Sequence, residues 1–389
     1  MEHGLRRTHL FESHVSAGAK MIDFHGFELP IWYSSIQEEH LETRRSVGLF
    51  DVSHMGFFRF HGEDVQSWLS SVSTQDYMKF QPGSCGYCHF LDHSGYIIDD
   101  MIFAISSDTE VFGVPNSTMV RIVFDWLSLL LPPDNSISIE DLSEQTSIVA
   151  IQGPKTHEVL GEILGKENCV GRFRCQKITD NDLGISGWIQ GTGYTGERGA
   201  EVFIPNEQAT MLWEALLSHD YVSPVGLGAR DTLRMEKGYL LSGQDFLWPE
   251  IDVVKDGLPD RFLARTTLES AVPFGLDMSH NFVGRAALIQ SDSDVRLLGM
   301  QCAERGPSPR PGHAVYSGPD EDSEVIGYVT SGGPSPSLGM SGIAIGYLEN
   351  FDGEEVWIQT SNKRRVRSTF KARPFIRRNF FLKNNQMQS

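Results

Sequence analysis

The pattern of apolar and polar positions predicts an α+β body that fills most of the chain. Apolar residues at helical spacing, bounded by Ser, Gly or Pro, predict helices over residues 10–18, 34–48, 63–73, 118–131, 154–164, 206–219 and around 227–236. Alternating or continuous apolar runs predict strands over residues 49–62, 86–92, 96–106, 111–117, 147–154 and 185–205, the last interrupted by a loop. We expect this body to occupy residues 1–287, with an inner α/β subdomain at about residues 59–137.

The last quarter of the chain changes character. Short apolar runs, each bounded by Gly, Pro, Asn or Asp, follow one another from residue 295 to residue 370. Short strands at this spacing predict a small antiparallel β-barrel, which we assign to residues 288–389. Residues 247–264 have no clear period and contain two prolines, so we interpret them as a loop that packs on the body.

A glycine-rich loop interrupts the strand pattern at residues 191–199. Gly191, Gly193 and Gly196 match the spacing G-x-G-x-x-G. A dinucleotide site needs a helix directly after that motif, whereas an alternating strand follows here. The loop therefore suits a flat ligand, with Tyr194 available to stack and with Glu197 and Glu201 available to accept paired N–H donors. The alternative is an ordinary hairpin whose glycines serve only its turn.

Two adjacent acids, Asp99 and Asp100, lie inside an apolar run. Successive side chains of a strand face opposite ways, so one carboxylate points toward the apolar face and the other does not. A carboxyl group in apolar surroundings can be tuned into a general acid or base. A strand end with both acids in water is the alternative. His54 lies in the apolar run 49–62, and we expect it to have a structural role.

Charge excludes several classes of partner. The net charge of −18 argues against a nucleic-acid or anionic-membrane binder, and no apolar run reaches the roughly 20 residues of a spanning helix. A basic cluster at residues 363–378 runs against this trend and is either a solvated face or an anion-docking site. With no recognisable export signal, we expect a cytoplasmic protein, or one of the mitochondrial matrix if the chain is a mature eukaryotic one.

The five cysteines indicate free thiols in a reducing compartment. Cys85, Cys88 and His89 match the C-x-x-C-H pattern of covalent haem attachment. Their neighbours indicate a strand, and attachment of this kind accompanies export. We therefore expect neither haem nor a metal.

Six motifs in series resemble the aminomethyltransferase, or T-protein, family of the glycine cleavage system. They are DVSHMG (51–56), GYIIDDM (95–101), IQGP (151–154), GTGYTGERGAE (191–201), GLGARDTLRMEKG (226–238) and TSGGPSPSLG (330–339). The resemblance runs from about residue 6 to residue 378. It implies a folate-binding fold of two α/β subdomains plus a C-terminal antiparallel β-barrel, in a cloverleaf arrangement around a central folate channel.

The resemblance also implies an activity, in which a one-carbon unit passes from aminomethyl-lipoyl H-protein to tetrahydrofolate with release of ammonia. By position in the motifs, Asp100 matches the catalytic carboxylate, and Glu201 and Arg230 match the groups that hold the pterin ring. The remaining pocket positions are matched by Met55, Tyr87, Asn116, Tyr194 and Tyr239. Tetrahydrofolate is thus the expected co-substrate and lipoylated H-protein the expected partner.

Two departures from the family pattern concern the one-carbon donor. Ser242 replaces an aromatic residue, and the loop 247–264 replaces a short link. Two alternatives follow: a tetrahydrofolate-dependent demethylase or methyltransferase that acts on a small methylated compound, and a folate-binding module without catalysis. The acid at Asp100 argues against the second, because pterin binding needs no carboxylate at the reacting edge.

Overall fold

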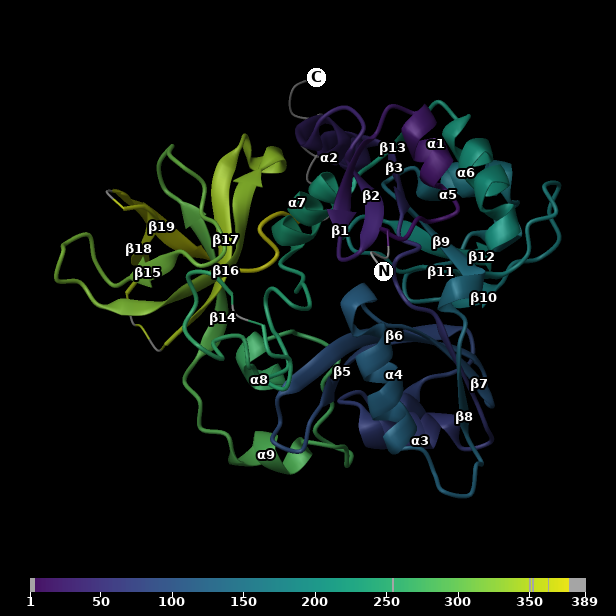
Figure 1. The fold of residues 1–389 in the computed structure, drawn as a ribbon, viewed down its shortest axis with the longest axis horizontal. Helices are drawn as coiled ribbons and strands as arrows, with labels where there is room; N and C mark the ends of the chain where they lie inside the picture. The colour runs from purple at the N-terminus through teal and green to yellow at the C-terminus, as the bar shows by residue number, and fades with distance from the viewer. Residues whose placement is uncertain (1–3, 254, 350, 352, 363, 378–389) are drawn as a thin grey trace. The chain divides into compact units, whose positions relative to one another are not determined.

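The computed structural model describes residues 4–253, 255–349, 351, 353–362 and 364–377, and these form two compact units (Figure 1). The first unit contains the described residues 4–88 and 101–231, and the second contains residues 89–100 and 232–377. The α+β class is as predicted. The domain boundary near residue 287 stays a prediction.

A six-stranded sheet organises the first unit. Its strand order is β10 (Cys175–Lys177), β11 (Trp188–Gln190), β12 (Gly199–Pro205), β9 (Thr146–Gln152), β3 (Val47–Asp51) and β13 (Val222–Pro224). Helices α5 (Thr156–Ile163) and α6 (Ala209–Leu217) supply Leu160 and Trp213 to a core with Val149 and Val202 of the sheet. Helix α1 (Phe11–Ser16) adds His14, whose ring centre lies 5.2 Å from that of Trp213. Because side chains alternate along a strand, the residues between these core positions, among them Gln190 and Glu201, face the other side of the sheet.

A second sheet has the order β5 (Ser84–Leu91), β6 (Ile97–Ser107), β7 (Glu110–Val114), β4 (Phe58–His61) and β8 (Ser138–Asp141). Helices α3 (Val65–Val72) and α4 (Val120–Leu129) pack on β4, where the rings of Phe60 and Trp68 lie 5.8 Å apart and those of Phe58 and Phe124 lie 5.5 Å apart. The remaining elements are the hairpin β1 (Lys20–Phe24) and β2 (Phe27–Trp32), and helices α2 (Ile36–Arg45), α7 (Leu227–Lys237), α8 (Thr267–Ser270) and α9 (Arg285–Gln290).

The prediction of a single strand over residues 49–62 is wrong. The chain leaves the first sheet after β3, turns through residues 52–57 and enters the second sheet as β4. The turn depends on Gly56, whose N–H donates to the carbonyl of Pro115 and where a Cβ would lie 2.4 Å from the ring of Pro115. His54 and Met55 therefore lie in a turn between two sheets.

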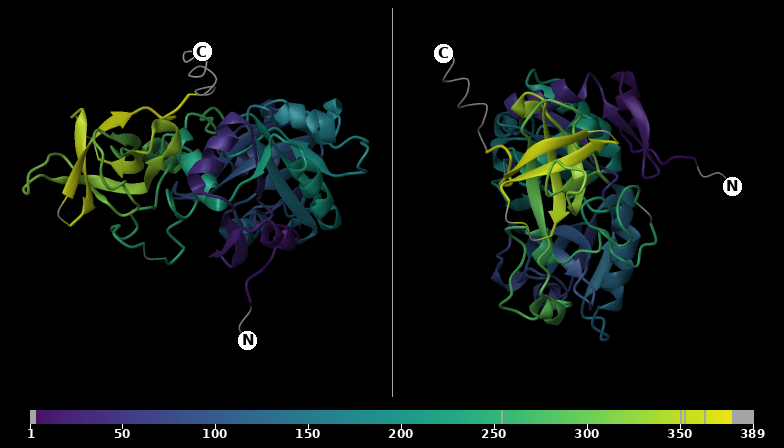
Figure 2. Two further views of the ribbon diagram at one scale, coloured as in Figure 1. Left: turned by 90° about the horizontal axis from the view of Figure 1, so that it is seen from above. Right: turned by 90° about the vertical axis from the view of Figure 1, so that its left-hand side faces the viewer.

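The predicted barrel is present and closed. Its strands are β14 (Arg296–Cys302), β17 (Ser341–Leu348), β16 (Val325–Ser335), β15 (Ala314–Tyr316), β18 (Glu355–Ser361) and β19 (Arg364–Lys371), in this order around the barrel. Figure 2 follows these green to yellow strands from two further directions. Val329, Ala344, Val356 and Ile358 are among the apolar residues that fill its core.

Residues 247–264 form a loop, as predicted, without a helix or strand among those that the structure describes. The loop packs within the second unit. Trp248 donates from Nε1 to Asp92 Oδ2 over 3.1 Å, the N–H of Leu247 donates to the carbonyl of Leu263, and Phe262 joins the apolar core. Any part of this loop in the choice of donor stays a prediction.

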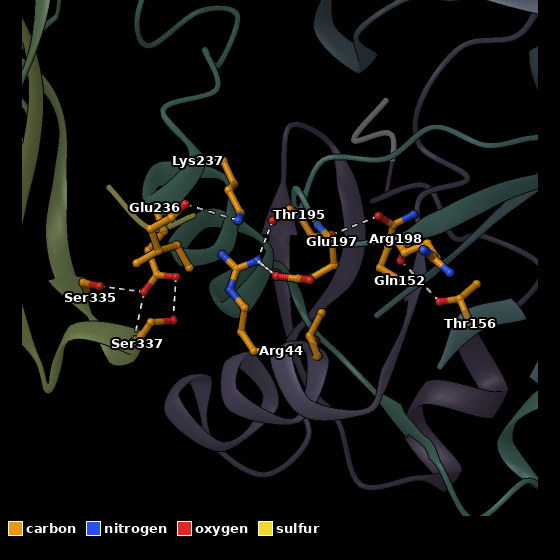
Figure 3. Close-up of polar contacts among 12 residues, drawn as sticks. Arg44, Gln152, Thr156, Thr195, Glu197, Arg198, Glu236, Lys237, Ser335 and Ser337 are labelled. Carbon is orange, nitrogen blue, oxygen red and sulfur yellow. Dashed lines mark hydrogen bonds and ion pairs between the residues drawn. The ribbon is translucent and has the colours of Figure 1, made fainter. Parts of the chain in front are cut away.

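Two charged residues of helix α7 are buried inside the second unit. Arg234 is fully buried and donates to Asp245 over 2.8 Å and to Ser331 over 2.8 Å. Glu236 is also fully buried and accepts hydrogen bonds from Ser335 and Ser337 (Figure 3). Buried charges need such partners. The serine partners come from the barrel, far away in sequence, whereas Asp245 lies in the turn after helix α7.

Three arginines of the basic cluster contact other residues of the second unit. Arg365 lies 3.6 Å over the Tyr316 ring, Arg367 pairs with Glu355 at 3.1 Å, and Arg364 donates to the carbonyl of Arg305. Lys363 and Arg378 lie outside the described residues. Docking of an anion on this cluster stays a prediction.

All five cysteines are free, as predicted. None of the described helices combines the length and the apolar character needed to cross a bilayer.

Candidate ligand-binding site

The glycine-rich loop between β11 and β12 is built around the side chain of Gln152. This buried amide donates to the carbonyls of Thr192 (3.0 Å) and Ala200 (3.3 Å) and accepts from the Thr195 hydroxyl (2.9 Å). A Cβ at Gly193 would lie 2.0 Å from Gln152 Oε1. The glycine is therefore required for a close approach of the backbone to the amide, rather than for a phosphate.

A buried ion pair holds the same loop from helix α2. The Arg44 side chain is 0% exposed, donates to the carbonyl of Thr195 over 2.6 Å and pairs with Glu197 at 3.0 Å (Figure 3). Glu197, expected to accept ligand N–H groups, thus serves the loop itself. The loop is fixed on two sides before any ligand binds.

Glu201, Arg230 and Tyr194 come together in the first unit. The guanidinium of Arg230 lies 4.8 Å from the ring centre of Tyr194. Burial lowers the pKa of Arg230, while the charge of Glu201 and the nearby Tyr194 act in the opposite direction. The Thr192 hydroxyl donates to Glu201 Oε2 and so fixes the carboxylate. The arrangement offers an acceptor, a cation and an aromatic face within one site, which suits a flat polar heterocycle.

The turn after β3 is anchored by a buried acid. Asp51 lies 2.9 Å from His14 Nε2, accepts from the Thr8 hydroxyl over 2.6 Å and accepts from the N–H of Ser53. Burial alone would raise the pKa of Asp51, but the hydrogen bonds and the charge interaction with His14 hold it below its usual range. The anchor fixes the turn that carries His54 and Met55.

His54 is a neutral buried base beside this site. Burial and the charge of Arg230 lower its pKa to about 3. Asp51 acts in the opposite direction, and His25 adds a smaller lowering effect. Its ring lies 5.4 Å from that of Phe24, and its Nδ1 has no hydrogen-bond partner among the described residues. The interaction with Arg230 indicates that His54 lies near that guanidinium, and its predicted structural role stays a prediction.

The eight residues predicted for the site share one property, since each is partly exposed rather than buried or fully solvated. In the first unit they are Met55, Tyr87, Asn116, Tyr194, Glu201 and Arg230, and in the second they are Asp100 and Tyr239. Asp99 is fully buried, so the two aspartates of β6 alternate as predicted. The ligand-binding roles of these residues stay predictions.

Sequence reasoning missed the residues that shape the loop. Gln152 and Thr192 lie inside two of the family motifs. The available signal was a polar side chain at the end of an apolar strand for Gln152, and one between two glycines for Thr192. Arg44 carries no such signal, because a charged residue on an amphipathic helix is usually solvated.

Comparisons with known proteins agree with this architecture. Residues 10–260 match the GCVT N-terminal domain, and residues 296–376 match the Glycine cleavage T-protein C-terminal barrel domain. An aminomethyltransferase of Prosthecochloris aestuarii is 35% identical over 92% of this chain and 96% of its own, and one of Chlorobaculum parvum is 37% identical over 86% and 88%. The crystal structure of glycine cleavage system aminomethyltransferase T from Bartonella henselae superposes with a TM-score of 0.83 at 27% identity, covering 96% of this chain and 98% of that one.

Arg44→Met is expected to destabilise the protein by about 3–5 kcal/mol, because it leaves the buried Glu197 carboxylate without its cation. The neighbouring Arg45→Met is the matched control. Arg45 is about half exposed and lies 3.9 Å from Glu42, so its loss is expected to cost less than about 1 kcal/mol. Equilibrium denaturation of both variants measures the difference, and equal effects would contradict a buried pair.

His54→Leu is expected to flatten the dependence of stability on pH. The folded pKa of about 3 lies below the unfolded value of about 6.5. Stability is therefore fully present above pH 6.5 and is lost as pH falls toward 3, at up to about 1.4 kcal/mol per pH unit. His89, whose pKa burial also lowers to about 3, adds a slope of the same sign that the variant retains. Unfolding measured between pH 7 and pH 4 tests this, and an unchanged slope refutes it.

Proposed function

The chain belongs to the glycine cleavage T-protein family, and we propose that it is an aminomethyltransferase. In this proposal it moves the one-carbon unit from aminomethyl-lipoyl H-protein to tetrahydrofolate and releases ammonia. The observation that carries the proposal is the match of both parts of the chain, at 35% identity over 92% of its length, to enzymes named aminomethyltransferase.

The cluster in the first unit supports tetrahydrofolate as the co-substrate. A pterin ring has adjacent N–H donors on one edge, which suit the carboxylate of Glu201, and a carbonyl, which suits the guanidinium of Arg230. Tyr194 offers a face for stacking. Thr192 and the contacts of Gln152 hold these groups in place, so the site loses little conformational entropy when a ligand binds.

The proposal assigns four further contacts by their positions in the family motifs. Met55 and Tyr87 form pocket walls, and Asn116 and Tyr239 supply polar or stacking contacts. All four are partly exposed and thus available to a ligand.

Asp100 carries the acid–base role in this proposal. It is the partly exposed member of the pair, in a strand whose neighbouring residues Ile98 and Met101 are buried. Loss of ammonia leaves an electron-poor carbon that a folate nitrogen attacks, so the protein contributes orientation and a charge at the reacting edge rather than a nucleophile.

The donor is the part of the proposal most open to test. Ser242 and the loop 247–264 depart from the family pattern, and the alternative is removal of a methyl group from a small methylated compound. The deciding assay measures tetrahydrofolate-dependent ammonia release from aminomethylated H-protein alongside a panel of methylated sulfonium, amine and aryl-ether compounds. Turnover of a panel compound without ammonia release from H-protein would replace the proposed donor.

Asp100→Asn is expected to lower turnover by about two orders of magnitude or more while tetrahydrofolate affinity stays within a few fold, since a positioned acid–base group is lost and the pterin contacts remain. Asp99→Asn is the comparison within the pair. It alters a buried side chain, so it is expected to change stability more than turnover. Equal losses of turnover in both variants would show that the wrong aspartate was chosen.

Glu201→Ala and Arg230→Ala are each expected to weaken tetrahydrofolate binding by roughly 2 to 5 kcal/mol, because each leaves a ligand group or its partner charge unpaired. The control is Glu207→Ala, an exposed acid just beyond the end of β12, which is expected to leave affinity unchanged. Titration calorimetry compares the three. Wild-type affinity in both site variants would remove these residues from the pterin site.

A further inference from the structure

Gln190, the last residue of β11, is a buried amide without hydrogen-bond partners in the described part of the chain. Its side chain is 0% exposed, and neither Nε2 nor Oε1 has a hydrogen-bond partner among the described residues. Burying an amide without partners is unfavourable, and an apolar side chain of the same size would avoid that penalty. The observation indicates a hydrogen-bond partner from outside the described residues.

The register of the sheet places this amide beside Glu201. Gln190 of β11 lies directly opposite Glu201 of β12, and Cys175 of β10 lies opposite Gln190 on the other side. Directly opposed side chains project from the same face with Cβ atoms about 4.5–5.5 Å apart. Ile189, the preceding residue, belongs to the apolar core under the helices, so Gln190 faces away from that core, toward the side of Glu201.

The other polar groups in this row have internal partners. The Glu201 carboxylate accepts from Thr192. The Cys175 thiol donates to the carbonyl of Ser84 and hydrogen-bonds the thiol of Cys85. Gln152, the second glutamine on this face, is as buried as Gln190 and makes three hydrogen bonds. Two glutamines of one sheet thus differ in whether the fold uses their amides.

We propose that the Gln190 amide is a binding group for the heterocyclic ligand held by Glu201, and that it hydrogen-bonds a polar atom of the ring edge next to those bound by the carboxylate. This inference rests on the proposed function, because it takes the ligand to be the pterin of tetrahydrofolate. A primary amide has one acceptor and two donor hydrogens, so it complements a ring edge whose neighbouring atoms alternate between donor and acceptor. The carboxylate of Glu201 supplies acceptors alone.

This role gives Gln190 a part in specificity. A site that buries a polar group discriminates against ligands that leave that group unpaired. In the unliganded protein the same group is a source of instability, since its hydrogen bonds to water have been lost without replacement. Affinity and stability should therefore respond to its removal with opposite signs.

The test compares Gln190→Met with Gln152→Met, two replacements of a buried amide by an apolar side chain of similar size. Gln190→Met is expected to raise the melting temperature of the unliganded protein by about 1–3 °C and to weaken tetrahydrofolate binding about tenfold. Gln152→Met removes satisfied hydrogen bonds and is expected to lower the melting temperature. Thermal unfolding without ligand and calorimetric titration with tetrahydrofolate supply the two readouts.

The possible outcomes separate this inference from the proposed function. Wild-type protein that binds no tetrahydrofolate overturns the proposed function and the inference together. Wild-type binding with unchanged affinity in Gln190→Met overturns the inference alone and assigns the amide to an internal water or to packing. A fall in melting temperature with unchanged affinity does the same.

A second variant covers failure of Gln190→Met to fold. Gln190→Asn keeps the amide but withdraws it by one methylene, and it is expected to weaken tetrahydrofolate binding to a similar degree. Affinity equal to that of the wild type in Gln190→Asn would again overturn the inference.

Discussion

The buried amide of Gln152 is the constraint on which the candidate site depends. It forms hydrogen bonds with residues of the loop on both sides of Gly193, so the loop closes over one side chain instead of over a ligand. Tyr194 and Glu201 lie inside or just after the segment that this amide shapes. An amide within the protein forms stronger hydrogen bonds than it would in water and is costly to leave unpaired, so the loop has one preferred conformation.

Three buried charged pairs also connect different segments of the chain. Arg44 with Glu197 and Asp51 with His14 join segments that are distant in sequence, and Arg234 with Asp245 joins helix α7 to the turn that follows it. Pairs of this kind contribute little net stability compared with apolar replacements, but breaking one is costly. Their effect in this protein is to specify which segments meet: helix α2 with the glycine loop, helix α1 with the turn at His54, and helix α7 with the loop that contains Asp245.

Two buried polar groups, the amide of Gln190 and Nδ1 of His54, lack hydrogen-bond partners among the described residues. On the face of the sheet that carries Glu201, the Gln152 amide makes three hydrogen bonds, whereas the Gln190 amide has no partner among the described residues. The Nδ1 atom of His54, in a ring kept neutral by burial and by Arg230, also lacks a partner among the described residues. Gln190 lies opposite Glu201 and His54 lies near Arg230, the two charged residues that we propose bind the ligand. A site for a polar heterocycle needs hydrogen-bonding groups that the protein itself does not occupy.

Elements whose signals are local could be predicted from the sequence alone. Periodicity predicted the helices around Trp213 and Leu160, the barrel strands and the strand–loop–strand at residues 185–205, because an apolar face must be buried whatever covers it. The six motifs in series predicted the T-protein family. Three features became visible in the folded structure: residues 49–62 pass between two sheets, Arg234 and Glu236 are buried, and the Gln152 amide is hydrogen-bonded whereas that of Gln190 has no partner among the described residues. Each of these depends on partners distant in sequence, such as Pro115 for the turn at Gly56, and local propensity contains no information about where those partners will lie.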